Sequence, residues 1–226
     1  MHEKNTWYPL NKDIKQDFEF LTSKLNQDFV ITSTNSDNNL WIIGHYSDHK
    51  PVDYYLYYRD KYKLDYLFSS NSKQKNYPFT KMYPQTIKTR DGLPMVCYLS
   101  LPRWQDTGSG KTNNPIPFVL FVHGGPYARE EWAFNPTHQW LANRGYGVLS
   151  INYRGSSGFG KEFLNKGDGQ WGMKMHDDII DAANWLKENK LAIPDQIAIM
   201  GGSYGGYATL VGLTKTPGFF AAGIDI

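Results

Sequence analysis

The stretch that most constrains how this chain can fold is the heptapeptide at 201–207, which reads Gly-Gly-Ser-Tyr-Gly-Gly-Tyr. It contains the pattern Gly-x-Ser-x-Gly, in which two glycines let a strand turn sharply into a helix and expose the serine hydroxyl. The apolar run at 196–200 suits a buried strand, and residues 204–213 suit a helix. The sequence therefore predicts a nucleophile elbow with Ser203 between Gly201 and Gly205. The alternative is a glycine-rich turn with an idle serine.

The segments around this heptapeptide alternate between strand and helix patterns. Asp91 and Gly92, a dipeptide that favours a type I′ hairpin, separate the first two predicted strands. All six predicted strands lie at 86–90, 93–101, 118–122, 147–153, 196–200 and 220–226. This order predicts an α/β fold, a mostly parallel sheet with helices on both faces. Ser203 follows the fifth strand, as in an α/β-hydrolase, where the loop after strand three supplies an oxyanion-hole amide.

The first 83 residues show a different pattern. Apolar residues at 14, 18, 21 and 25 would share one face of a helix. Short β-rich runs then follow at 29–32, 40–46, 54–58 and 64–68. Four short strands in a meander indicate one β-propeller blade or a small antiparallel sheet, and one blade cannot bury both its faces. A polar stretch ends at Tyr83, so we place a boundary between a domain of residues 1–83 and one of residues 84–226.

The amino-acid composition excludes several kinds of partner and structure for this chain. Lys plus Arg number 24 against 22 Asp plus Glu, so we expect neither nucleic acid nor an anionic membrane surface as a partner. The chain has no apolar run long enough to span a bilayer. Its first residues lack the apolar core of a signal peptide, which favours the cytoplasm over export. Cys97 is the single cysteine, which excludes an internal disulfide, and we interpret it as a small strand hydrophobe.

Three other motifs suggest ligands, but each lacks its context. Residues 110–112 read Gly-Lys-Thr, yet a P-loop needs a glycine where Gln105 stands, and the prolines that follow disfavour a helix. The glycine-rich loop at 154–160 has the reverse of the dinucleotide-binding spacing. His45 and His49 straddle a predicted turn without further ligands at a recognisable spacing. We therefore expect no cofactor and no metal.

Asp177 and Asp178 stand at the start of a predicted helix with an apolar stripe. Carboxylates there interact favourably with the helix dipole. We expect them to cap this helix and to pair with Arg154, rather than to act in catalysis.

Four motifs together resemble the prolyl oligopeptidase family of serine peptidases, in particular its acylaminoacyl-peptidase-like branch. They are His-Gly-Gly-Pro at 123–126, Asn-Tyr-Arg-Gly-Ser at 152–156, the Trp-Gly and Met-His-Asp-Asp of 171–178, and the heptapeptide at 201–207. The resemblance covers residues 84–226 and extends more loosely upstream, where the family carries a β-propeller. It implies Ser203 as nucleophile, with the backbone amides of Tyr204 and Gly125 as oxyanion hole. It also implies short peptides as substrates, admitted by the propeller and cleaved through an acyl-enzyme.

The chain departs from the family in its histidines. An α/β-hydrolase places its acid and then its histidine after the serine. The six histidines here stand at 2, 45, 49, 123, 138 and 176, and the only acid after Ser203 is Asp225. The resemblance places His123 beside the oxyanion loop, where it would shape that loop. We therefore expect a fragment that lacks most of the propeller and the last two strands, and that is inactive alone. The alternatives are an esterase with the same fold or a non-catalytic binding remnant.

Overall fold

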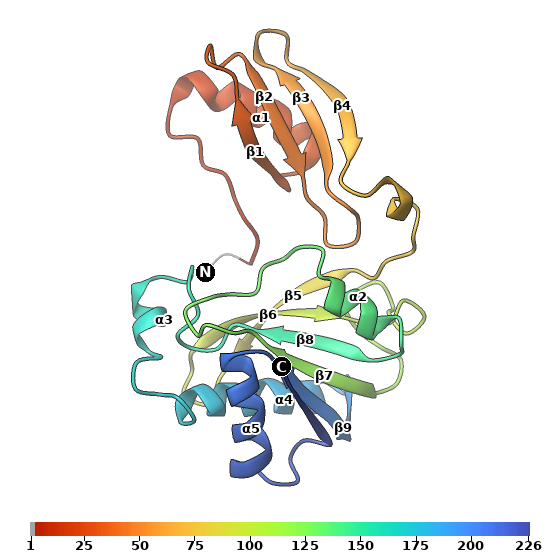
Figure 1. Ribbon diagram of the computed structural model, residues 1–226, viewed down its shortest axis with the longest axis vertical. Helices are drawn as coiled ribbons and strands as arrows, with labels where there is room; N and C mark the ends of the chain where they lie inside the picture. The colour runs from red at the N-terminus through yellow and green to blue at the C-terminus, as the bar shows by residue number, and fades with distance from the viewer. Residues whose placement is uncertain (1–2) are drawn as a thin grey trace. The chain divides into compact units, whose positions relative to one another are not determined.

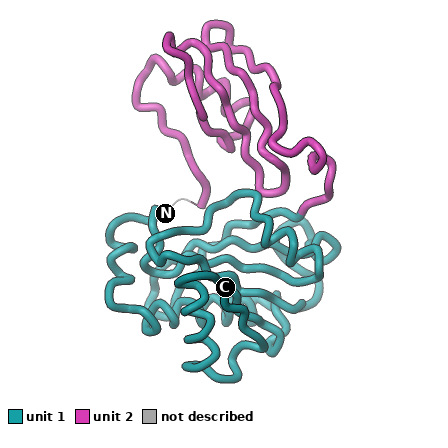
Figure 2. The backbone as a smooth tube through the Cα atoms, in the orientation of Figure 1, with its two compact units in different colours: residues 1, 80–226 teal, residues 2–79 magenta. Residues whose placement is uncertain are grey.

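The computed structural model describes residues 3–226, which form two compact units. Figure 2 shows the division, with one unit ending at Phe79 and the other running from Thr80 to Ile226. Each unit has its own hydrophobic core. No helix in this described part of the chain is both long and apolar enough to cross a bilayer.

The smaller unit is one helix on a four-stranded antiparallel sheet of order β1-β2-β3-β4. Its elements are α1 (Lys15–Leu25), β1 (Phe29–Thr34), β2 (Leu40–His45), β3 (Asp53–Tyr58) and β4 (Lys63–Ser69), with short 3-10 helices at Lys12–Ile14, Arg59–Lys61 and Ser72–Gln74. The predicted helix and four strands are therefore confirmed, with ends that differ by one or two residues. The core is the buried stripe of α1 against the strands, and it contains Phe18, Leu21, Trp41, Ile43 and Tyr57.

The larger unit is built on a six-stranded mixed sheet of order β10-β9-β7-β8-β6-β5. Its strands are β5 (Met82–Lys88), β6 (Pro94–Ser100), β7 (Ile116–Val122), β8 (Gly147–Ile151), β9 (Ala192–Gly201) and β10 (Ala222–Asp225). The strands β10, β9, β7 and β8 run parallel, while β6 is antiparallel to β8 and to β5. This is the predicted α/β-hydrolase type of fold, and β9 is the fifth strand of this sheet in chain order (Figure 1).

Helices cover both faces of this sheet, as predicted. The helices are α2 (Pro136–Ala142), α3 (Lys161–Asn165), α4 (Lys174–Glu188) and α5 (Tyr204–Lys215). The main core packs the apolar stripe of α4, including Ile179 and Leu186, and Ala208 of α5 against one face. On the other face Leu141 of α2 packs against Val148. The central strands are consequently buried on both faces, which explains their unbroken apolar runs.

Two local predictions need correction. The first strand of the larger unit begins at Met82, inside the stretch that we predicted to be linker. The hairpin between β5 and β6 is not of type I′, since only Gly92 of the central pair has a positive φ, of 86°. The turn is longer than two residues, because Thr89 N–H donates to the Leu93 carbonyl oxygen at 3.0 Å. The side chain of Asp91 is held by Arg154 and Thr89, so it is fixed by tertiary contacts and not by the turn alone.

Candidate active site

Ser203 lies in the turn between the end of β9 and the start of α5. Its φ of 55° and ψ of −118° are unusual for a residue with a side chain, and the residue is exposed to solvent. Backbone strain of this kind at a strand-to-helix turn is the geometry of a nucleophile elbow. We call residues 201–205 the elbow.

The two elbow glycines are required by a close approach of β7. A Cβ atom at Gly201 would lie 2.5 Å from the carbonyl oxygen of Val122, the last residue of β7. A Cβ atom at Gly205 would overlap the same oxygen even more severely. Any larger residue at either position would push the elbow away from β7. The glycines therefore allow the turn and also fix its distance from the neighbouring strand.

The loop that follows β7 lies directly beside Ser203. We call residues 123–126 the Gly125 loop. Val122 is opposite Gly201 in the parallel pairing of β7 and β9, so the loop and the elbow leave the sheet at the same edge. A Cβ atom at Gly124 would lie 3.3 Å from Ser203 Cβ and 3.8 Å from Ser203 Oγ. Among residues 3–226, neither the Gly125 nor the Tyr204 backbone N–H donates to another group. Both amides are therefore free to bind an oxygen atom.

His123 holds the peptide group that precedes Gly125. Its Nδ1 lies 2.7 Å from the Gly124 carbonyl oxygen, and because a carbonyl oxygen only accepts, Nδ1 carries the proton. Its Nε2 lies 2.9 Å from Ser156 Oγ. Burial lowers the pKa of His123 to about 4, so the ring is neutral at pH 7. In a trans peptide the C=O and N–H groups point in opposite directions, so this bond also sets the direction of the Gly125 N–H.

Tyr153, which lies just after β8, packs against the ring of His123. The two rings stack with centroids 4.5 Å apart, and the Tyr153 hydroxyl donates to the His123 carbonyl oxygen at 2.8 Å. The Tyr153 ring also lies 5.3 Å from that of Tyr204, the first residue of α5. Trp171 packs edge-on against Tyr204 at 5.0 Å. A continuous group of aromatic rings thus connects the Gly125 loop to the elbow. These ring contacts could not be predicted from the sequence, because no local pattern marks a contact between residues thirty positions apart.

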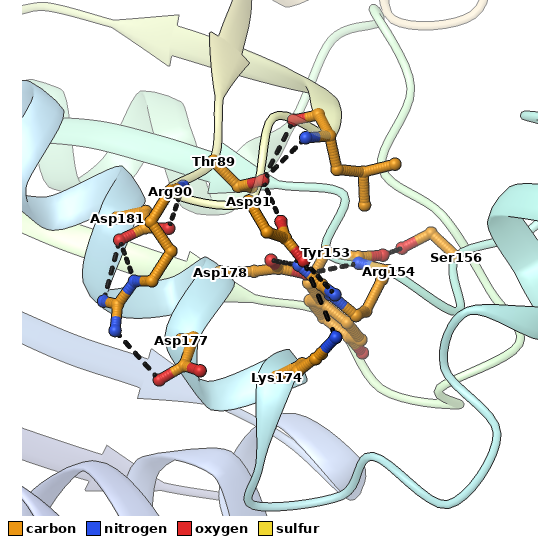
Figure 3. A network of polar contacts seen from close by, with 11 residues as sticks. Thr89, Arg90, Asp91, Tyr153, Arg154, Ser156, Lys174, Asp177, Asp178 and Asp181 are labelled. Atoms are coloured by element: carbon orange, nitrogen blue, oxygen red, sulfur yellow. Dashed lines mark hydrogen bonds and ion pairs between the residues drawn. The ribbon is translucent and has the colours of Figure 1, made fainter.

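The acidic pair at the start of α4 divides between two arginines (Figure 3). Asp178 pairs with Arg154, with Oδ1 2.7 Å from Nη2, and this prediction is confirmed. Asp177 instead lies 3.1 Å from Nη1 of Arg90. Neither carboxylate caps the helix through a side-chain bond, since α4 begins at Lys174, three residues before Asp177.

No described histidine is placed to accept a proton from Ser203. Among residues 3–226 none hydrogen-bonds to its hydroxyl, and both ring nitrogens of His123 are occupied. His138 is enclosed between Ser100 and Ser150, and burial lowers its pKa to about 3. The other described histidines are His45 and His49 of the smaller unit and His176, which lies 3.4 Å from Thr216 Oγ1.

The Gly-Lys-Thr stretch and the single cysteine lie in well-defined local structure. The stretch at 106–112 forms a small loop closed by a bridge between Asp106 and Thr112, and no helix follows it before β7. Cys97 is fully buried in β6, and burial raises the pKa of its thiol. Within the described residues no group of three or more His, Cys, Asp or Glu side chains is arranged to hold a metal ion.

Comparison with known proteins gives consistent matches. Residues 132–225 match the model of the prolyl oligopeptidase family. Dipeptidyl aminopeptidase BIII of Pseudoxanthomonas mexicana is 46% identical over 224 residues, covering 99% of this chain and 32% of that protein. Dipeptidyl peptidase family member 6 of Caenorhabditis elegans is 37% identical over 242 residues, covering 100% of this chain and 33% of that protein.

Solved structures agree with these matches. The acylaminoacyl peptidase of Pyrococcus horikoshii superposes with a TM-score of 0.71 at 26% identity, covering 88% of this chain and 31% of that one. The chain spans about a third of the length of the curated relatives it matches.

Proposed function

Because this chain belongs to the prolyl oligopeptidase family of serine peptidases, we propose that it carries the nucleophile of a peptidase, Ser203. One observation supports this most directly. Ser203 stands exposed in a strained strand-to-helix turn, and the Gly125 loop lies against its side chain. An activated serine needs such exposure, together with nearby amides that can hold the negative charge of the reacting carbonyl oxygen.

In the proposed reaction, Ser203 Oγ attacks the carbonyl carbon of a peptide bond while a base takes its proton. The oxygen of the tetrahedral intermediate becomes negative and accepts hydrogen bonds from the Gly125 and Tyr204 amides. The base then gives this proton to the leaving nitrogen, and collapse of the intermediate releases the amine and leaves an acyl group on Ser203. Water then removes the acyl group. Removing one donor of an oxyanion hole costs about 10²- to 10³-fold in turnover, so the position of Gly125 matters greatly.

We propose that the 226-residue chain alone does not carry out this reaction. No histidine follows Ser203 in the sequence, and His123 is neutral, buried and engaged by other groups. Without a base a serine hydroxyl is a poor nucleophile at neutral pH, and in subtilisin loss of the histidine costs roughly 10⁶-fold in turnover. The acid and base of the active enzyme would therefore come from outside these residues.

The substrates we propose are short peptides. Three of the relatives are named dipeptidyl aminopeptidase BIII, dipeptidyl peptidase family member 6 and acylamino-acid-releasing enzyme 1, and these names are compatible with short peptides as substrates. The unit before Thr80, within the domain of residues 1–83 that we predicted, would be one blade of a propeller. That upstream sheet also favours a peptidase over an esterase, in which a cap domain would be expected instead.

Labelling with a fluorophosphonate tests the proposal. We expect the 226-residue chain to remain unlabelled at Ser203, because no base activates the hydroxyl. If the reading frame continues beyond residue 226 with an Asp and then a His, the longer product should label rapidly, and Ser203→Ala should abolish that labelling. Rapid labelling of the 226-residue chain at Ser203 would disprove its inactivity. Labelling of the longer product that persists in Ser203→Ala would disprove the role of Ser203.

A further inference from the structure

We propose that Asp178, acting through Arg154, is a positioning residue for the Gly125 amide. The inference rests on the proposed function, because it concerns the oxyanion hole of that same site. A series of contacts connects the first turns of α4 to the peptide group between Gly124 and Gly125. The first two contacts join residues that are far apart in the sequence, and the third joins the neighbours His123 and Gly124.

The first contact fixes the backbone after β8. Asp178 Oδ2 accepts the backbone N–H of Arg154 at 2.8 Å and its Nε–H at 2.9 Å, while Oδ1 accepts from Nη2 at 2.7 Å. Asp178 is completely buried and Arg154 nearly so. One carboxylate thus holds both the main chain and the side chain of the same residue (Figure 3). Neither the backbone nor the side chain of Arg154 can therefore move without breaking a charge-assisted hydrogen bond to Asp178.

The second contact transmits this position to His123. Arg154 stands between Tyr153 and Ser156 in a short turn, in which the Ser156 backbone N–H donates to the Tyr153 carbonyl oxygen at 3.0 Å. Both residues reach back to His123, Tyr153 through its hydroxyl at 2.8 Å and Ser156 through its Oγ at 2.9 Å. Holding Arg154 therefore holds both supports of the His123 ring.

The third contact reaches the oxyanion peptide. His123 Nδ1–H donates to the Gly124 carbonyl oxygen at 2.7 Å, and the same peptide group carries the Gly125 N–H. A small displacement of the turn at 153–156 would move the His123 ring and rotate this peptide. Catalytic hydrogen bonds need placement within about 0.5 Å, which is why such supporting contacts matter.

Two carboxylates and two cationic side chains meet around Arg154, so that their charges balance. Asp91 accepts from Nη1 and Nη2, each at 2.9 Å, so two carboxylates share one guanidinium. The remaining negative charge faces Lys174, whose Nζ lies 4.0 Å from Asp91 Oδ2. Asp178 itself has only Arg154 as a cationic partner within salt-bridge distance among the described residues. Removing the charge of Asp178 would therefore leave Arg154 with Asp91, a partly exposed residue of the hairpin between β5 and β6, as its one ion-pair partner among the described residues.

Asp177 offers a matched control for this proposal. It is the preceding residue on the same helix and also pairs with an arginine, Arg90, but both of these side chains are partly exposed. Arg90 has no contact with the turn at 153–156 among its described bonds. Asp177→Asn and Asp178→Asn therefore make the same chemical change one residue apart, and only Asp178→Asn alters the support of His123.

The experiment measures the His123 ring and the Gly125 amide by NMR in the isotopically labelled 226-residue chain. In Asp178→Asn we expect the Gly125 amide resonance to shift and the measured pKa of His123 to rise from its low value toward 6.5, because the enclosure of the ring loosens. In Asp177→Asn both should stay as in the wild type. Arg154→Lys, which keeps the positive charge but loses the planar fork, should shift both readouts in the same direction as Asp178→Asn.

Every outcome of this experiment decides the question. If Asp178→Asn lowers the free energy of unfolding but leaves both NMR readouts unchanged, the pair only stabilises the fold and the proposal is wrong. If Asp178→Asn does not fold, Arg154→Lys decides on the same two readouts. The result is independent of whether Ser203 is the nucleophile, since no step requires hydrolysis. A failure of the labelling experiment would in turn leave this result intact.

Discussion

The elbow, which contains Ser203, and the neighbouring Gly125 loop keep their shapes by opposite means. The elbow is shaped by missing side chains, since Gly201 and Gly205 let the backbone press against the Val122 carbonyl oxygen. The Gly125 loop is shaped by added side chains, because His123 holds its peptide group and is itself held by residues after β8. Both loops leave the same edge of the sheet, but their hydrogen bonds to distant residues differ in kind. The elbow bonds through its backbone to the backbone of Ile226, whereas the Gly125 loop is held by side chains that follow β8.

This difference indicates which changes should destabilise each loop. The elbow depends on the close approach of its backbone to β7, so its stability should not change with pH but should fall when a side chain is added at Gly201 or Gly205. The Gly125 loop depends on a buried imidazole and on hydroxyl groups, so it should respond to protonation and to the loss of single hydrogen bonds. Three experiments test this contrast.

The largest effect should come from Gly205→Ala. Alanine normally stabilises a helix relative to glycine by up to about 1 kcal/mol, but here its Cβ would overlap the Val122 carbonyl oxygen. We expect the free energy of unfolding to fall by about 4 kcal/mol or more, measured by urea denaturation. Gly202→Ala is the control in the same turn, since its Cβ would lie 3.3 Å from the nearest atom, the Ile226 carbonyl oxygen. Equal stability of both variants would show that the elbow is not held by close contact.

The second effect is a pH dependence that belongs to the Gly125 loop. Burial lowers the pKa of His123 to about 4, while an unfolded histidine titrates near 6.5. Between these values the unfolded chain binds a proton that the folded chain does not, so stability falls as the pH falls. His123 should contribute a slope of about 1.4 kcal/mol per pH unit, or about 3 kcal/mol over the whole range.

The variant His123→Gln isolates this contribution. Other buried groups titrate in the same range, including His138, and Glu130, whose pKa burial raises to about 7 and which acts in the opposite direction. Subtracting the stability of His123→Gln from that of the wild type at each pH cancels them. Parallel curves for the two proteins between pH 6.5 and 4 would contradict a neutral, buried His123.

The smallest effect should come from Tyr153→Phe. The substitution keeps the ring stacked on His123 and removes only the hydroxyl that donates to the His123 carbonyl oxygen. We expect the free energy of unfolding to fall by about 1 kcal/mol, in the range typical of a lost intramolecular hydrogen bond. Tyr207→Phe, at an exposed ring on α5, provides a comparison that should lie within about 0.5 kcal/mol of the wild type. A loss as large as that for Gly205→Ala would mean that the ring stack itself depends on the hydroxyl.

Most of the fold could be predicted because its signals are local. The apolar run before Gly201 and the alternation of strands and helices both depend on neighbouring residues. The errors occurred where distant contacts act on a short segment. The hairpin at Asp91 lacks the predicted type I′ geometry, and its aspartate is bound to Arg154, 63 residues further along the chain.

In the candidate active site, too, local features could be predicted from the sequence and contacts between distant residues mostly could not. The sequence alone determined that a serine stands between two glycines at a strand-to-helix turn, because that pattern is written in five consecutive residues. The pairing of the acidic residues with Arg154 was also expected from the sequence. Only the tertiary structure decided that Asp178 alone makes it while Asp177 pairs with Arg90, and that Tyr153 and Ser156 both contact His123. The physical reason is that backbone geometry and periodic burial act between neighbours in sequence. Hydrogen bonds and ion pairs instead act between whichever groups the sheet brings within about 3 Å of one another.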